Sequence, residues 1–280
     1  MKIQLLNTGF FKLDGGAMFG VVPKQIWNKL NPADENNLCT WALRCLLVED
    51  GNKLILIDAG IGNKQKENFL RHYHLRDTIS IDQAVANAGY NPDEVTDVVL
   101  THFHFDHCGG ALTYGTDETK IVPTFKNATY WTNDAHWLWA TEPNPREKAS
   151  FLSENILPLQ EAGQLSFIPF GESPFEHIEF LWAYGHTEGM MIPHIQYKDK
   201  TLVFVSDLIP SVAHLPVHYV MGYDTKPLIT MEEKENFLTQ AVQENYVLIF
   251  QHDPIYECCT LTQTDKGVRS REVFNFSEVA

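Results

Sequence analysis

Short runs of apolar residues, separated by glycine, asparagine and charged residues, recur along most of the chain. Runs of about four to eight such residues predict buried strands. We expect strands at Lys2–Leu6, Trp41–Val48, Lys53–Ile57, Val95–Leu100, Asn127–Trp131, Gln164–Ile168, Ile178–Ala183, Thr201–Val205 and Tyr246–Phe250, the last of these being the final core strand.

Three segments have the residue pattern of a helix: Ile81–Ala88, Asn133–Ala140 and Met231–Glu244. Strands and helices follow one another in two rounds, which predicts an α/β protein with two sheets covered by helices on the outside. The segment Thr141–Arg146 interrupts this pattern only briefly, so we expect one domain over residues 1–280.

A glycine-rich segment, Phe10–Leu30, carries Met18, Phe19 and Trp27. One interpretation is a surface loop with a short helix that places Trp27 in the core. The other is an apolar wall beside an active site, since binding loops often join rigid strands.

The composition of the chain excludes several classes of partner and site. With 21 basic and 36 acidic residues, the chain has a formal charge of −15, which disfavours nucleic acids and anionic membranes as partners. It has five cysteines and no C-x-x-C, which argues against a disulfide framework and a thiolate zinc site. The N-terminus lacks the apolar core of a signal peptide and no stretch is long enough to span a membrane, so we expect a cytoplasmic protein.

The segment Thr101–Gly110, THFHFDHCGG, contains the strongest chemical signal. His102 and His104 are two apart and can point the same way from an extended strand end. Asp106 and His107 follow the turn and can point to a second position nearby. Burying three imidazoles and a carboxylate would be costly without a cation, so the segment predicts a metal site.

Three more strand ends carry residues of the same kind: His186 in YGHTEG, Asp207 in FVSDLIP and His252 in FQHDP. Five histidines and two aspartates suffice for two divalent ions that share one carboxylate. We expect the first ion on His102, His104 and His186, the second on Asp106, His107 and His252, and Asp207 as the bridge.

Imidazole and carboxylate ligands suit zinc, although manganese, iron or cobalt would also fit. Two ions about 3.5–4 Å apart can hold a hydroxide that is a nucleophile at neutral pH. Asp58, at the end of the run LILIDAG, is expected to orient a ligand histidine or the loop.

The motif, together with LILIDAG, GHTEG, VSDLIP and FQHDP, resembles the metallo-β-lactamase-fold hydrolases over roughly Lys2 to Pro254. The segment DGGAMFGVVPKQIWNK is similar to the branch that holds N-acyl-homoserine lactonases and methyl parathion hydrolase. The resemblance implies an αββα four-layer sandwich with a two-metal site on the seven residues named above. Antibiotic-hydrolysing members with a cysteine ligand carry it where Asp207 stands, which argues against β-lactamase activity.

The expected function is a dinuclear zinc hydrolase of the quorum-quenching lactonase type, in which the bridging hydroxide attacks a neutral ester-like carbonyl. Asp106 would also pass a proton to the leaving oxygen. A phosphotriesterase, a thioesterase of the glyoxalase II type and a catalytically silent binding module are the alternatives. The resemblance also suggests a homodimer.

Some lactonases place a substrate-facing tyrosine just after the bridging aspartate, where this chain has Leu208-Ile209-Pro210. Tyr223 is the candidate to replace it. We expect Phe19, Trp27 and Phe103 to form the apolar wall of the substrate pocket.

Overall fold

The computed structural model describes residues 1–117 and 119–279. The chain forms two compact units, each assembled from two separate stretches. The first unit contains residues 1–9 and 43–174, and the second contains residues 10–42 and those from 175 onward. The single domain expected from the sequence stays a prediction.

One six-stranded sheet contains β1 (Lys2–Asp14), β2 (Leu38–Asp50), β3 (Lys53–Ile57), β4 (Asp97–Val99), β7 (Thr129–Thr132) and β8 (Leu165–Phe167). Its strand order is β1-β2-β3-β4-β7-β8, and β3, β4, β7 and β8 run parallel to one another. β3 pairs antiparallel with β2, so the sheet is mixed. The first unit also has a small hairpin of β5 (Leu112–Tyr114) and β6 (Ile121–Pro123).

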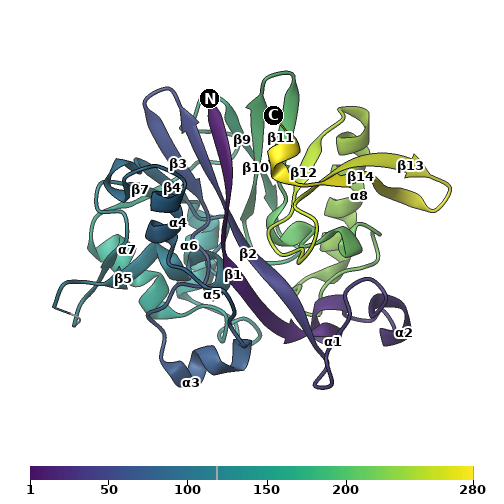
Figure 1. The fold of residues 1–280 in the computed structure, drawn as a ribbon, viewed down its shortest axis with the longest axis horizontal. Coiled ribbons are helices and arrows are strands. Elements are labelled where there is room, and N and C mark those ends of the chain that lie inside the picture. Colours follow the sequence, from purple (N-terminus) through teal and green to yellow (C-terminus); the bar gives the residue numbers. More distant parts are fainter. Residues whose placement is uncertain (118, 280) are drawn as a thin grey trace. The chain divides into compact units, whose positions relative to one another are not determined.

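The helices of the first unit are α3 (Glu67–Leu70), α4 (Ile81–Asn87), α5 (Phe105–Cys108), α6 (Asp134–Thr141) and α7 (Leu157–Glu161). Val85 of α4 and Ala140 of α6 are buried in one cluster with Leu56 and Val98 of the sheet. α4 and α6 therefore cover the sheet through small and branched apolar side chains (Figure 1).

The sheet of the second unit contains β9 (Ile178–Ala183), β10 (Met190–Tyr197), β11 (Lys200–Phe204), β12 (Val247–Ile249), β13 (Cys258–Thr264) and β14 (Gly267–Phe274). Its order is β14-β13-β12-β11-β10-β9. Only the pair β11–β12 is parallel, so this sheet is mixed as well.

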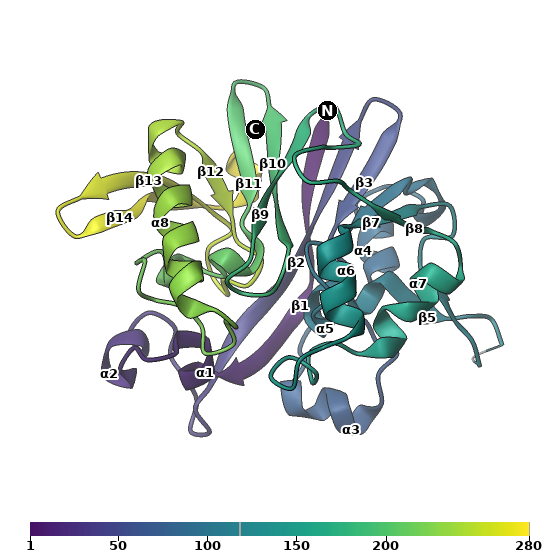
Figure 2. The same ribbon diagram turned by 180° about the vertical axis from the view of Figure 1, so that it is seen from behind.

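The long helix α8 (Pro227–Gln243) crosses the hairpin strands β13 and β14 of the second sheet (Figure 2). Its residues Phe237, Leu238 and Ala241 are buried against Leu248 and Phe250 at β12. The unit also contains α1 (Gly15–Phe19) and α2 (Lys24–Trp27), with the 3-10 turns η5 (Ser206–Leu208), η6 (Val212–His214) and η7 (Phe276–Glu278). None of the helices in the described residues has the length and apolar composition to span a membrane.

Two mixed sheets covered by helices confirm the predicted α/β class. Several boundaries were wrong. β1 continues to Asp14 rather than ending at Leu6, so the predicted loop Phe10–Leu30 begins as a strand. α8 begins at Pro227 rather than Met231, because proline is well tolerated in the first helical turn, where its missing N–H is not needed.

The prediction that Tyr246–Phe250 is the final core strand was also wrong, because the hairpin β13–β14 follows it. The segment CCTLTQT was not predicted as a strand because most of its residues are polar. It is nevertheless β13, and its first two residues, Cys258 and Cys259, are buried in the core. β10 was missed too: its apolar run is interrupted by Pro193 and His194, which normally argue against an inner strand.

Candidate metal centre

The sheet of the first unit explains how Asp58 comes to lie beside the histidine-rich motif. β3 and β4 are parallel neighbours, so the residues that follow them meet at the same edge. The Asp58 carboxylate accepts hydrogen bonds from the Thr101 backbone N–H (2.8 Å) and the Thr101 hydroxyl (2.9 Å). Asp58 has a φ of +58°, a strained value for a residue other than glycine and one that is frequent at functional sites.

The four polar residues of the motif form one buried group, which we call the first donor cluster: His102, His104, Asp106 and His107. His102 Nε2 lies 3.1 Å from His104 Nδ1, and the rings of His102 and His107 have centroids 3.8 Å apart. Asp106 Oδ2 lies 3.8 Å from His107 Nε2. One nitrogen of each histidine therefore faces another member of the cluster.

The opposite nitrogen of each of these histidines has a partner outside the cluster. His107 Nδ1 lies 2.9 Å from Asp58 Oδ2, and His104 Nε2 lies 3.4 Å from Glu147 Oε1. His102 Nδ1 lies 3.1 Å from the Thr101 hydroxyl, which already donates to Asp58 and so can only accept from the ring. Each partner favours a proton on the far nitrogen, which is the tautomer whose inner nitrogen can bind a metal.

The loop that carries the first donor cluster is itself fixed. His136 Nε2 accepts a hydrogen bond from the Phe103 backbone N–H at 2.8 Å, and the two rings stack with centroids 5.4 Å apart. Asn133 caps α6 by accepting from the His136 backbone N–H. His136 itself is fully buried.

The Gly109-Gly110 pair after the motif is needed for close backbone packing. A Cβ atom at Gly109 would collide with the backbone of Ile61, and one at Gly110 would collide with the carbonyl oxygen of Ala59. The buried Lys64 ammonium donates to the Gly109 carbonyl. The strand end at Asp58 and the helix α5 can meet only because these two positions lack side chains.

The second unit gathers the remaining predicted donors, His186, Asp207 and His252, in what we call the second donor cluster. β9, β11 and β12 point in the same direction, because β10 is antiparallel to both β9 and β11 and because β12 is parallel to β11. The three donors follow the ends of these strands and are all buried. Asp207 lies between the two rings, with its Oδ2 3.1 Å from His186 Nε2 and its Oδ1 3.1 Å from His252 Nε2.

In the second donor cluster, too, the ring nitrogens that point away from Asp207 have hydrogen-bond partners. His186 Nδ1 lies 2.8 Å from Asp224 Oδ1, and His252 Nδ1 donates to the Ala42 carbonyl at 2.8 Å. Burial by itself would lower the pKa of His186, but the carboxylates of Asp207 and Asp224 outweigh it and raise that pKa to about 10. Ser206, just before Asp207, has a strained φ of +45°.

The predicted pocket residues lie in different surroundings. Phe19 and Trp27 are buried and stacked, with centroids 5.3 Å apart, and Phe19 also stacks on His214. Phe103 is fully buried, whereas Tyr223 is 38% exposed. A role for these four in a substrate pocket stays a prediction.

Sequence reasoning did not identify Glu147 and Asp224. They lie 43 and 38 residues from the histidines that they contact, and both are in segments without regular spacing. The only signal for them was the general rule that a metal-binding histidine needs an acceptor on its other nitrogen.

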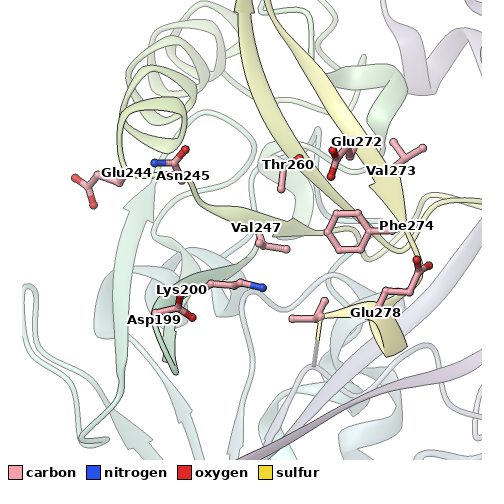
Figure 3. A pocket seen from close by; sticks show the side chains of 11 residues that line it. Asp199, Lys200, Glu244, Asn245, Val247, Thr260, Glu272, Val273, Phe274 and Glu278 are labelled. Atoms are coloured by element: carbon pink, nitrogen blue, oxygen red, sulfur yellow. The ribbon is translucent and has the colours of Figure 1, made fainter.

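A separate hollow of about 710 Å³ lies in the second unit near the C-terminal hairpin (Figure 3). The side chain of Lys200 extends into it, and Phe274 forms part of its wall. Its lining contains none of the seven donors.

The comparisons with known proteins agree with this geometry. Residues 44–252 match the family model of the metallo-beta-lactamase superfamily. The chain belongs to this superfamily. The matched segment contains all seven donors, and its two buried His/Asp clusters are consistent with the dinuclear metal centre predicted from the sequence.

Solved structures of the superfamily share the fold of this chain. A probable metal-dependent hydrolase from Staphylococcus aureus is 30% identical, with a TM-score of 0.88, over 98% of this chain and 96% of its own. The dizinc quorum-quenching lactonase AidC, solved with a product, is 21% identical, with a TM-score of 0.80, over 98% and 95%. The hydrolase AbOPH is 21% identical, with a TM-score of 0.79, over 98% and 94%. The metallo-β-lactamase fold predicted from the sequence is thereby confirmed.

Proposed function

We propose that the protein is a hydrolase that uses two divalent metal ions, with zinc as the expected metal, to hydrolyse a lactone or a similar neutral ester. In this proposal His102, His104 and His186 would hold the first ion, Asp106, His107 and His252 would hold the second, and Asp207 would serve both. Bound ions of this kind supply an activated water and a Lewis acid for the carbonyl oxygen.

One observation carries the proposal. All five histidines of the two clusters have the nitrogen remote from the cluster tied to a hydrogen-bond partner: Thr101, Glu147, Asp58, Asp224 and the Ala42 carbonyl. Metal-binding histidines almost always have their other ring nitrogen held in this way, because the partner fixes the ring and selects the tautomer that can bind a metal. A catalytically silent module is expected to have lost donors, but here all seven are present and buried.

The carboxylates have distinct roles in this proposal. Asp207 has one oxygen near each histidine of the second cluster, the geometry that a shared ligand needs. Asp106 is the most exposed of the seven donors, at 8%. We assign to it the transfer of a proton to the leaving oxygen as the ester bond breaks.

The side chains around the first donor cluster favour a neutral, apolar substrate. Phe105, between two donors in the sequence, packs against Phe69 and Tyr73, with centroids 5.4 and 4.7 Å away. Phe151 lies 4.9 Å from the His104 ring. Burial and the nearby Asp106 raise the pKa of Tyr73 to about 12, so its hydroxyl stays protonated and can donate to a substrate carbonyl.

The test is a hydrolase screen of the zinc-loaded protein across acyl-homoserine lactones, aryl esters, thioesters and phosphotriesters. We expect the highest kcat/KM on a lactone. His104→Ala and Asp207→Ala should each lower it by at least about a hundredfold, since each removes a metal ligand. His72→Ala is the matched control, because His72 is exposed and outside both clusters.

Unchanged turnover in both donor variants would end the metal-dependent proposal. A preference for phosphotriesters or thioesters would keep the metal centre but replace the substrate class.

A further inference from the structure

Glu147 lies in the segment between α6 and α7 and contacts the motif from behind. We propose that Glu147 is a positioning residue that determines which nitrogen of His104 can bind a metal. The proposal rests on the metal centre of the proposed function. It adds a residue that neither the motif nor the strand-end pattern contains.

The Glu147 carboxylate is held from several sides. The residue is 3% exposed. Its Oε2 accepts hydrogen bonds from Trp139 Nε1 and Asn144 Nδ2, both at 2.6 Å, and its Oε1 faces His104 Nε2 at 3.4 Å. Since Trp139 and Asn144 occupy one oxygen, the other oxygen is directed at the histidine.

This orientation selects one tautomer of His104. A carboxylate oxygen can only accept, so Nε2 must carry the proton and Nδ1 must be bare. Nδ1 is the atom that faces His102 Nε2, inside the first donor cluster. Glu147 therefore points the lone pair of His104 at the place where a cation would sit.

His107 needs the opposite arrangement. Asp58 faces its Nδ1, which leaves Nε2 for the cluster. Two histidines three residues apart must thus expose different nitrogens, and each has its own carboxylate to enforce this. Because Asp58 already binds His107 and Thr101, a second carboxylate from another segment is needed for His104.

The segment that carries Glu147 is attached to the motif through its backbone as well. The Phe105 backbone N–H donates to the Ser150 carbonyl at 3.1 Å, and the Glu147 N–H lies within hydrogen-bonding distance of Asn144. These hydrogen bonds hold the Glu147 carboxylate in place beside the His104 ring.

The substitution Glu147→Gln separates positioning from packing. Trp139 and Asn144 both donate hydrogen bonds to residue 147, so the amide oxygen of the new glutamine must face them. The NH2 group of the glutamine would then face His104 Nε2. A donor there requires Nε2 to be bare, which moves the proton to Nδ1 and blocks the metal-facing nitrogen. Glu142→Gln is the matched control, because Glu142 is exposed in the same segment.

Two measurements test the proposal. Nitrogen-15 NMR of the histidine side chains in the metal-free protein should show His104 protonated at Nε2 in the wild type and in Glu142→Gln, and at Nδ1 in Glu147→Gln. Titration with Zn²⁺ against a competing chelator should show about 10–100-fold weaker binding of one ion in Glu147→Gln alone.

A wild-type His104 protonated at Nδ1 would overturn the proposal, even if the variant does not fold. Unchanged zinc affinity in a folded Glu147→Gln, with or without a loss of stability, would also overturn it and leave Glu147 a packing residue. Zinc binding without lactone hydrolysis would contradict only the proposed substrate, so the two failures are distinguishable.

Discussion

At the scale of single residues, the candidate site consists of donors and of the groups that orient them. His186 and His252 present Nε2 to Asp207 because the Asp224 carboxylate and the Ala42 carbonyl hold their Nδ1 atoms. An imidazole that is free to rotate or to change tautomer would lose affinity for a metal. The orienting groups should therefore matter nearly as much as the ligands.

Asp224→Asn tests this at His186. Asp224 accepts from both the His186 ring and the Met221 backbone N–H, so an amide must turn its NH2 group toward one of these donors. We expect zinc affinity to fall by about 10–100-fold, measured by competition with a chelator. Asp199→Asn, at an exposed position, should bind zinc like the wild type, and equal affinity in both variants would contradict the role of Asp224.

The raised pKa of His186 predicts a pH dependence of the metal-free protein. In the folded chain the His186 ring keeps its second proton up to about pH 10, whereas in the unfolded chain the ring releases this proton near pH 6.5. The stabilising contribution is therefore complete below about pH 6.5 and is lost as the pH rises through 10. Urea titrations from pH 6 to 9 should show a falling free energy of unfolding, and His186→Gln should reduce the slope. Equal slopes would contradict the assignment.

The donors could be predicted from the sequence because each follows an apolar run, and the spacing of His102 and His104 is characteristic. The partners of His104 and His186 could not. Glu147 and Asp224 reach these histidines through loops whose course depends on tertiary contacts, such as that between the Lys226 backbone N–H and the Gly185 carbonyl.

At the scale of elements, parallel strand pairs bring the site residues together. β3 and β4 place Asp58 beside Thr101, and β11 and β12 place Asp207 beside His252. These strands were predicted because each contains a short run of apolar residues. β10 was missed because it contains Pro193, and β13 was missed because most of its residues are threonine or glutamine.

Gly110→Ala tests the contact between the strand end and α5. The new methyl group would collide with the carbonyl oxygen of Ala59, next to Asp58. We expect a loss of about 1–3 kcal/mol in the free energy of unfolding, the usual cost of overpacking, together with weaker zinc binding. Gly115→Ala is the control, since a methyl group there meets only ordinary contacts at 3.5 Å or more. Equal stability of the two variants would contradict the need for glycine.

At the scale of the whole molecule, the seven donors are divided between the units, four in the first and three in the second. β1 and β2 each contribute residues to both units. The family could be predicted from the order of the motifs, but the assembly of each unit from two stretches could not, because it depends on contacts between distant segments. The cytoplasmic location, the homodimer and the absence of nucleic-acid and membrane partners stay predictions.

The metal content of the purified protein tests the central claim most directly. After equilibration with zinc and removal of the excess by dialysis, elemental analysis should find two equivalents of zinc per chain in the wild type. His104→Ala and His252→Ala should each retain fewer. Less than one equivalent in the wild type, or two in both variants, would contradict the proposal that these donors hold a pair of ions.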